Sequence, residues 1–192
     1  PINITGAEDV DLPELNLHNQ ESEGQVENNG HTIEVSFRNP KNSLTIGDDV
    51  YKLQQIHFHA PSENENDGKT YPLQGHVVYK TDTGKIPVVS VLYNYGDENQ
   101  ALKQIWDKIP QAANTETELS QPISLDDFYP EDKDYYNFEG SLTTPPCTEG
   151  VNWIVFKKQE TISKEQVEKF TQTLGFENNR PIQETNGRKI KE

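Results

Sequence analysis

The segment Tyr51–His59 reads Tyr-Lys-Leu-Gln-Gln-Ile-His-Phe-His and carries two histidines at alternate positions of a predicted β-strand. Because successive side chains of a strand point to opposite faces, we expect Leu53, Gln55, His57 and His59 to share one face. The attachment points of the two imidazoles then lie about 7 Å apart, so both rings can reach one ion. The segment therefore predicts a strand and half of a metal site together.

A third imidazole comes from His76, in the sequence Gln-Gly-His-Val-Val-Tyr, which also predicts a strand. The residues before it include Pro61, Gly68 and Pro72, so the chain can turn there and return as an antiparallel neighbour. Three neutral nitrogens with no fourth protein ligand are typical of a catalytic zinc ion with one open position. The alternative is three solvent-facing polar residues, but three of the chain's five histidines fit this one pattern.

The length and charge of the chain restrict its partners. Its 192 residues suit a single domain spanning 1–192. The formal net charge of −15 is spread along the sequence, and such a field repels nucleic acids and anionic membranes. No apolar run approaches the ~20 residues of a membrane-spanning helix. We therefore expect a small-molecule substrate, no nucleic-acid partner and no membrane insertion.

The hydrophobic pattern predicts a mainly β (α+β) fold. Alternating or apolar runs predict strands at 31–37, 50–59, 71–80, 86–94 and 151–156. Helical spacing predicts one helix at 97–109 and a second after Ser163, with a capping box at Gln166 and a C-cap at Gly175. Residues 1–29 carry only weak strand signals and are expected along the surface. We predict one domain with a large central, mostly antiparallel twisted sheet and a few peripheral helices.

The stretch Gly140–Gly150 contains two adjacent prolines and the hydroxyls of Thr143 and Thr144. Alone it predicts a rigid turn, but beside a metal its hydroxyls could hydrogen-bond a metal-bound oxygen. It also holds Cys147, the only cysteine, so no internal disulfide can form. This cysteine is either a small buried apolar residue or, if a histidine lies beside it, a nucleophile.

With these features together, the chain resembles the α-class carbonic anhydrases over essentially its whole length, and the bacterial members most. The matching motifs are Pro1-Ile2-Asn3-Ile4, Asn28-Asn29-Gly30-His31, His57-Phe58-His59, Pro61-Ser62-Glu63, His76-Val77-Val78, Ser141 to Val151, Trp153, Asn178-Asn179-Arg180-Pro181 and Asn186-Gly187-Arg188. The resemblance implies a carbonate dehydratase, a hydro-lyase that hydrates carbon dioxide reversibly to bicarbonate and a proton.

The resemblance also implies a role for each matching site residue. Zn2+ is bound by His57, His59 and His76, and Thr143 accepts a hydrogen bond from the zinc-bound hydroxide while donating to Glu63. His31 matches the proton shuttle. Asn29 matches a residue that orders water, and Thr144 lines the bicarbonate side. The carbon dioxide wall matches Val78, Val88, Leu142, Val151 and Trp153.

Four positions bear on how the ligands are supported. Gln55, on the same predicted face as His57, fits the hydrogen-bond acceptor that a ligating histidine needs. Gln74 stands where the family usually has a glutamate that supports His76, so we expect an uncharged acceptor and weaker zinc retention. Glu34 stands where the family commonly has an amide and Tyr79 where it commonly has a histidine, and both could change the water structure of the cavity.

Two alternatives to the hydratase remain open, a weak zinc esterase and a non-enzymatic zinc-binding or adhesion module on the same fold. Relatives have an aromatic-rich segment before the Pro-Ile-Asn-Ile motif, which carries a cysteine that pairs with the one matching Cys147. This chain starts at Pro1, so Cys147 is expected to be free to link two chains in a homodimer. The resemblance implies a periplasmic or extracellular location, although no signal peptide is present.

Overall fold

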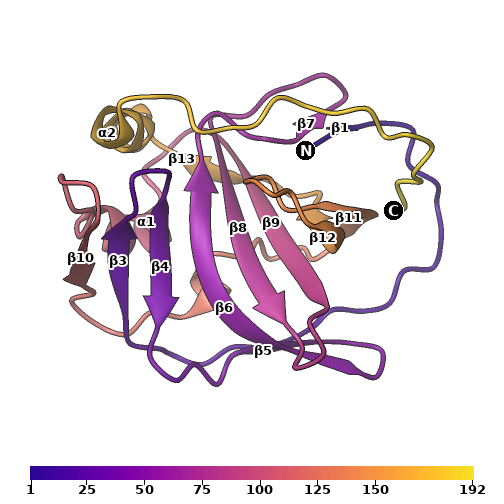
Figure 1. Cartoon of the computed structure of the whole chain (residues 1–192), viewed down its shortest axis with the longest axis horizontal. Coiled ribbons are helices and arrows are strands. Elements are labelled where there is room, and N and C mark those ends of the chain that lie inside the picture. The colour runs from indigo at the N-terminus through magenta and orange to yellow at the C-terminus, as the bar shows by residue number, and fades with distance from the viewer.

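A computed structural model describes all residues, 1–192, and its main feature is one 11-stranded sheet (Figure 1). The strands are β1 (Asn3–Ile4), β2 (Asn16–His18), β3 (Gly24–Asn28), β4 (Ile33–Phe37), β5 (Ser43–Ile46), β6 (Asp49–His59), β7 (Glu65–Asn66), β8 (Leu73–Lys80), β9 (Ile86–Tyr95), β10 (Thr115–Glu118), β11 (Tyr135–Ser141), β12 (Glu149–Phe156) and β13 (Glu160–Ile162). The main sheet runs β10-β3-β4-β6-β8-β9-β12-β11, and β1 pairs with β7 apart from it. Pairing in the main sheet is antiparallel except where β12 and β13 meet β9. The predicted mostly antiparallel twisted sheet is confirmed.

Two α-helices and one short 3-10 helix, η1 (Leu125–Asp127), accompany the sheet. Helix α1 (Gln100–Trp106) is shorter than predicted, because the Asn99 side chain accepts the Leu102 N–H and so starts the helix later. Helix α2 (Lys164–Leu174) has the predicted capping box and ends at Gly175, whose φ of 81° is left-handed. Neither helix is long and apolar enough to span a bilayer.

The two faces of the sheet have different roles. Most of the apolar side chains form a larger core with both helices, in which Trp106 of α1 lies 5.0 Å from Phe58 and 5.8 Å from Phe170 of α2, measured between ring centroids. The opposite face of β8, β9 and β12 carries a smaller apolar cluster that includes Val88 and Trp153. The three histidines lie on this second face, since the His76 ring contacts Trp153 of the smaller cluster. The C-terminal segment crosses from α2 toward β1 (Figure 1).

The alternation of β6 is broken by a β-bulge between Leu53 and Gln55. Because a bulge adds one residue to one strand, the side chains before it point to the faces opposite to those expected from unbroken alternation. Leu53 therefore pairs with Tyr79 and belongs to the larger core, whereas Gln55 stays with the histidines. The expectation that Leu53 shares the face of His57 is wrong.

Tyr79 also lies away from the site. It is fully buried in the larger core, and its hydroxyl is 2.7 Å from that of Tyr129. Because residues 76 and 79 differ by an odd number along a regular strand, their side chains point to opposite faces. Tyr79 cannot shape the water of the histidine face, contrary to expectation.

The N-terminal region contributes more to the sheet than predicted. Residues Gly24–Asn28 form β3, in which Val26 is fully buried, whereas we expected the whole region along the surface. The strand carries one large apolar side chain, too few for the alternation to be visible. The β8–β9 hairpin, by contrast, forms where predicted, with Thr81 N–H donating to the Lys85 carbonyl across the turn.

Candidate metal centre

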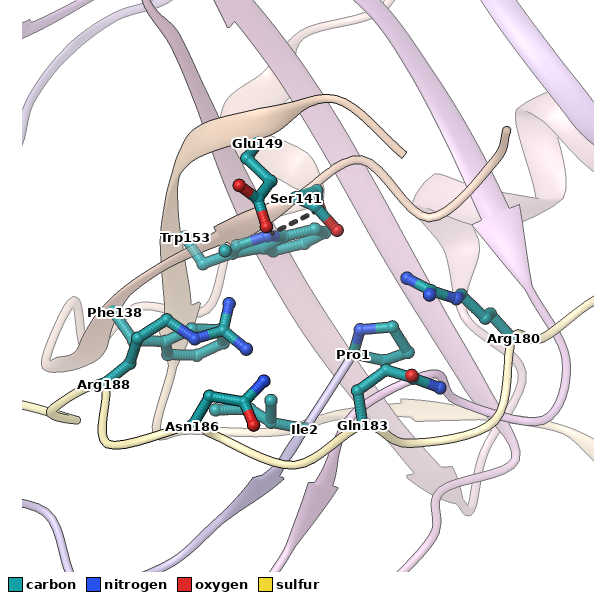
Figure 2. A pocket seen from close by; sticks show the side chains of 11 residues that line it. Pro1, Ile2, Phe138, Ser141, Glu149, Trp153, Arg180, Gln183, Asn186 and Arg188 are labelled. Atoms are coloured by element: carbon teal, nitrogen blue, oxygen red, sulfur yellow. Dashed lines mark hydrogen bonds between the residues drawn. The ribbon is translucent and has the colours of Figure 1, made fainter. Parts of the chain in front are cut away.

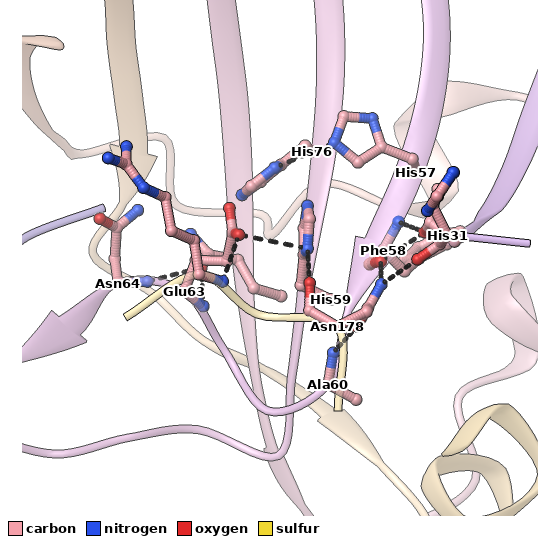
Figure 3. A network of polar contacts seen from close by, with 12 residues as sticks. His31, His57, Phe58, His59, Ala60, Glu63, Asn64, His76 and Asn178 are labelled. Atoms are coloured by element: carbon pink, nitrogen blue, oxygen red, sulfur yellow. Dashed lines mark hydrogen bonds and ion pairs between the residues drawn. The ribbon is translucent and has the colours of Figure 1, made fainter. Parts of the chain in front are cut away.

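The register of two neighbouring strands, β6 and β8, brings the predicted ligands together. His57 of β6 lies directly opposite His76 of β8, and His59 lies opposite Gln74. One ring nitrogen from each of the three histidines lies within 4.8 Å of those of the other two. Figure 3 shows the three rings converging. The connection from His59 to β8 therefore returns the chain as the predicted antiparallel neighbour of β6.

Hydrogen bonds fix the tautomers of two rings. His57 Nδ1–H donates to Gln55 Oε1 at 2.8 Å, and His59 Nδ1–H donates to the backbone carbonyl of Asn178 at 3.0 Å. A carbonyl oxygen only accepts, so in both rings Nδ1 carries the proton. The lone pair is then on Nε2, which is the atom left to bind a metal.

The spacing of the nitrogens suits zinc. His76 Nδ1 lies 3.2 Å from His57 Nε2. Two nitrogens bound tetrahedrally to zinc at 2.0–2.1 Å are about 3.3 Å apart. His59 Nε2 is buried and has no hydrogen-bond partner, which is the state of a ligand atom that faces a metal. The donor set is three imidazole nitrogens with no carboxylate among them, so it fits a zinc ion with one open position.

Burial keeps the ligands in the metal-binding form. His59 and His76 are almost fully buried, and His57 is partly so. Burial, and then the neighbouring histidines, lower the pKa of His57 to about 3 and that of His76 well below its usual value. Both rings are therefore neutral at pH 7, and neutral imidazole is the form that binds metal.

Glu63 lies beside His59 and is also buried. Its Oε1 accepts the backbone N–H of Arg180 at 2.9 Å and lies 3.4 Å from His59 Nδ1. Its Oε2 is buried with no hydrogen-bond partner. The carboxylate thus keeps one oxygen free to accept a proton donor, and Figure 3 shows it next to the three rings.

The threonine loop follows β11. Thr143 is half-buried and its hydroxyl makes no hydrogen bond, so the Thr143–Glu63 bond that the resemblance implies is not formed in this structure. Thr144 is exposed, and its carbonyl accepts the Cys147 N–H at 2.8 Å. Cys147 is a free cysteine.

His31 and Asn29 occupy the turn before β4. Asn29 Oδ1 accepts the backbone N–H groups of His31 and Thr32, both at 2.9 Å. This side chain therefore shapes the turn, in addition to any role toward water. The His31 ring is exposed, and Figure 3 places it beside β6, outside the cluster of three rings.

The five predicted wall residues gather in the smaller apolar cluster. Val88, Val151 and Trp153 are buried in it, and Val78 and Leu142 pack against it. The indole of Trp153 meets the His76 ring edge-on, with 4.8 Å between centroids, and donates its N–H to the Ser141 carbonyl at 3.1 Å. An apolar surface therefore borders the third ligand.

Gln74 does not support His76 as expected. Its Oε1 accepts the backbone N–H groups of Glu63 and Asn64, both at 2.9 Å, and its Nε2 donates to Ser90 Oγ at 2.6 Å. The two backbone donors fully occupy the carbonyl oxygen. His76 Nε2 is left buried and without a partner.

Glu34 lies directly opposite His57 on β4, on the histidine face. It is half-buried and makes no hydrogen bond or ion pair. Burial, and then the Glu27 carboxylate opposite it, raise the pKa of the Glu34 carboxyl. Its position on the histidine face is consistent with the expected effect on the water structure of the cavity, and that effect stays a prediction.

No role was predicted for Asn178, which connects the C-terminal segment to β6. Its side-chain oxygen accepts the Ala60 N–H at 2.9 Å, and its amide donates to the carbonyls of Phe58 and His31. Its own carbonyl holds His59. The only signal in the sequence was the Asn-Asn-Arg-Pro motif of the resemblance, because a ligand's backbone partner 119 residues away has no local pattern.

A separate cavity of about 170 Å3 lies near the chain's N-terminus (Figure 2). Trp153 lines it together with Phe138, and neither Arg180 nor Arg188, which also line it, pairs with a carboxylate. Arg188 instead donates to the backbone carbonyls of Glu184 and Thr185. None of the three histidines borders this cavity, so it is distinct from the metal centre.

A large twisted sheet that presents three imidazoles on adjacent strands, with a buried carboxylate and an apolar wall beside them, is typical of the enzymes that can hold a metal ion with three histidines. The family model described as "Eukaryotic-type carbonic anhydrase" matches residues 1–192. The chain therefore belongs to the eukaryotic-type, or α-class, carbonic anhydrase family.

Individual relatives agree with this assignment. The carbonic anhydrase of Neisseria gonorrhoeae is 43% identical over 190 residues, which cover 99% of this chain and 75% of the relative. The α-carbonic anhydrase of Photobacterium profundum superimposes with a TM-score of 0.95 at 41% identity, covering 100% of this chain and 88% of that one. The α-carbonic anhydrase of Thermovibrio ammonificans, solved with sulfanilamide, gives 0.97 at 40% identity and covers 100% and 85%. The resemblance to bacterial members is confirmed.

Proposed function

We propose that this chain is a zinc-dependent carbonic anhydrase that interconverts carbon dioxide and water with bicarbonate and a proton. The observation that carries the proposal is the convergence of His57, His59 and His76, with two tautomers fixed by carbonyl acceptors and a nitrogen spacing that suits zinc. Membership of the carbonic anhydrase family supports the reaction.

Zinc, when bound, supplies Lewis acidity that lowers the pKa of coordinated water to about 7, a value established on carbonic anhydrase itself. The protein's part is to hold the ligands in place. Gln55 and the Asn178 carbonyl keep the His57 and His59 rings oriented and protonated at Nδ1.

Glu63 and Thr143 are proposed to orient the attacking oxygen. The free Oε2 of Glu63 supports this role, because a carboxylate oxygen only accepts. If the Thr143 hydroxyl donates a hydrogen bond to Glu63 Oε2, its oxygen can only accept a hydrogen bond from a neighbouring O–H group. That oxygen's own lone pair then faces the substrate. This bond requires the Thr143 hydroxyl to come within hydrogen-bond distance of Glu63 Oε2.

The apolar cluster is proposed as the carbon dioxide site. Carbon dioxide is neutral and weakly polar, so Val78, Val88, Leu142, Val151 and Trp153 can hold it beside the third ligand without competing for the metal. Thr144 is proposed to line the side on which bicarbonate leaves. Its exposure supports contact with a charged product.

Proton export is proposed to run through His31, with Asn29 positioning it. The exposed His31 ring supports this role, because it can exchange protons with buffer. The Asn29 side chain holds the turn that carries it. In the His31→Ala variant we expect a slower turnover that added imidazole restores. Loss without rescue would contradict the shuttle.

Stopped-flow hydration of carbon dioxide on zinc-loaded protein tests the proposed function. We expect activity that disappears with a zinc chelator and returns with zinc. An ester substrate assayed on the same sample separates hydratase from esterase, and we expect ester hydrolysis only as a weak side activity. Zinc binding without either activity would instead favour the non-enzymatic binding or adhesion module.

Location and assembly remain proposals based on the resemblance. We propose a periplasmic or extracellular enzyme, which fractionation of cells tests. We propose that 1–192 is one domain and that the free Cys147 can link two copies in a homodimer. Equal masses with and without reductant would refute that link.

A further inference from the structure

Two glutamines on the histidine face differ in what they bind. Gln55 and Gln74 each lie two residues before a ligating histidine, on the same strand as that ligand. Gln55 accepts a hydrogen bond from His57, whereas Gln74 makes none with His76. Gln55 and Gln74 therefore make different contacts, although each lies two residues before a ligating histidine.

The Gln74 carboxamide is fully engaged by other groups. It has no solvent exposure, and its oxygen accepts two consecutive backbone N–H groups, those of Glu63 and Asn64, at 2.9 Å. Its nitrogen donates to Ser90 Oγ at 2.6 Å. Because both backbone groups are donors, the oxygen must face them, and the amide orientation is determined.

The segment held by Gln74 carries the free carboxylate of the site. Gln74 fixes the Glu63 backbone, and the Arg180 N–H fixes Oε1 of its side chain at 2.9 Å. The adjoining Asn64 is held further by Ser62 Oγ, which donates to its carbonyl at 2.8 Å. Together these contacts leave the buried Glu63 Oε2 unpaired beside the ligands.

We propose that Gln74 is a positioning residue for Glu63 and does not act through the metal ligand His76. The inference rests on the proposed function, in which Glu63 accepts the Thr143 hydroxyl. If Gln74 positions Glu63, substitutions of Gln74 should lower the reaction rate, whereas substitutions of Gln55 should lower the affinity for zinc.

A matched pair of variants, Gln74→Leu and Gln55→Leu, tests the proposal with three readouts on the full chain. These are zinc loss to a chelator, hydrogen exchange of the Glu63 and Asn64 amides by NMR, and the steady-state constants at saturating zinc. For Gln55→Leu we expect zinc affinity to fall about 10–100-fold, with both amides still protected. For Gln74→Leu we expect both amides to exchange faster and kcat to fall about 10-fold or more at little-changed KM, with zinc affinity within about threefold of wild type.

The Gln74→Glu variant provides a rescue. A carboxylate can accept both backbone N–H groups, and Ser90 can turn its hydroxyl to donate to it. We expect amide protection and most of kcat to return. The proposal is overturned if Gln74→Leu releases zinc as readily as Gln55→Leu while the Glu63 and Asn64 amides stay protected.

A Glu63→Gln variant separates this inference from the function on which it rests. If Glu63→Gln keeps full kcat, the catalytic role of Glu63 fails, and amide exchange in Gln74→Leu still decides whether Gln74 holds this segment. If Glu63→Gln lowers kcat and Gln74→Leu does not, the positioning role is wrong. We expect both to lower it.

Discussion

At the scale of single residues, carbonyl oxygens decide which ring nitrogen of His57 and His59 is free for a metal. Gln55 could be predicted as one acceptor, because strand alternation places it beside His57. Asn178 could not be, because it supplies a backbone carbonyl from a segment 119 residues away. Gln74 was placed near the ligands correctly, but its partners depend on a loop whose path the sequence does not reveal.

Asn178→Ala should weaken zinc binding about 10-fold or more. The substitution removes the bonds to Ala60, Phe58 and His31, so the carbonyl that orients His59 is no longer held in place. Competition with a chelator measures the affinity. Asn179→Ala is the matched control, because the Asn179 side chain makes no hydrogen bond, and equal affinities for the two variants would contradict this account.

The metal-free protein should lose stability on acidification, partly through His57. Burial lowers the His57 pKa to about 3 in the folded state, whereas the unfolded value is near 6.5. Between these two pH values the unfolded chain binds a proton that the folded chain does not. The free energy of unfolding therefore decreases as the pH is lowered, by up to about 1.4 kcal/mol per pH unit. Urea unfolding of the metal-free protein at pH 7 and pH 5 measures this loss. It should be smaller in His57→Gln, and an equal loss in both proteins would refute it.

At the scale of elements, the strands that could be predicted are those with visible alternation or an apolar run, such as β6, β8 and β9. Strand β10, Thr-Glu-Thr-Glu, has no apolar side chain and is held by pairing with β3, so its sequence gives no strand signal. The bulge in β6 depends on how that strand pairs with β8, which is likewise absent from a local pattern. The bulge does not affect the shared face of His57 and His59, because both residues follow it in the chain.

Gly140→Ala should destabilise the protein and slow turnover. Gly140 lies in β11, where an added Cβ would lie 2.9 Å from Cδ1 and 3.0 Å from Nε1 of Trp153. That indole cannot move freely, because it stacks on Phe138 and contacts His76. We expect a loss of about 1–3 kcal/mol in the free energy of unfolding, measured by urea unfolding. The cost should shrink in a Trp153→Phe background, and an unchanged cost there would show that the clash is not its cause.

At the scale of the whole molecule, a net charge of −15 surrounds a centre that must exchange an anion. The field acts on bicarbonate and not on neutral carbon dioxide, because its long-range part is Coulombic. The charge was visible in the sequence, whereas its relation to the site required the fold.

Raising the ionic strength from 0.01 to 0.15 M with a weakly coordinating salt should lower the KM for bicarbonate about twofold, because the Debye length falls from about 30 to 8 Å. The KM for carbon dioxide should stay constant and serves as the internal control. Steady-state kinetics in both directions measures the two values. Parallel changes in both would contradict a charge effect.

In the proposed site, three imidazoles hold one zinc ion and leave its fourth position open. X-ray absorption at the zinc edge of the loaded protein tests it most directly. We predict one zinc per chain, with three imidazole nitrogens at about 2.0–2.1 Å and one further light ligand. A sulfur at about 2.3 Å, or fewer than three imidazoles, would contradict the account.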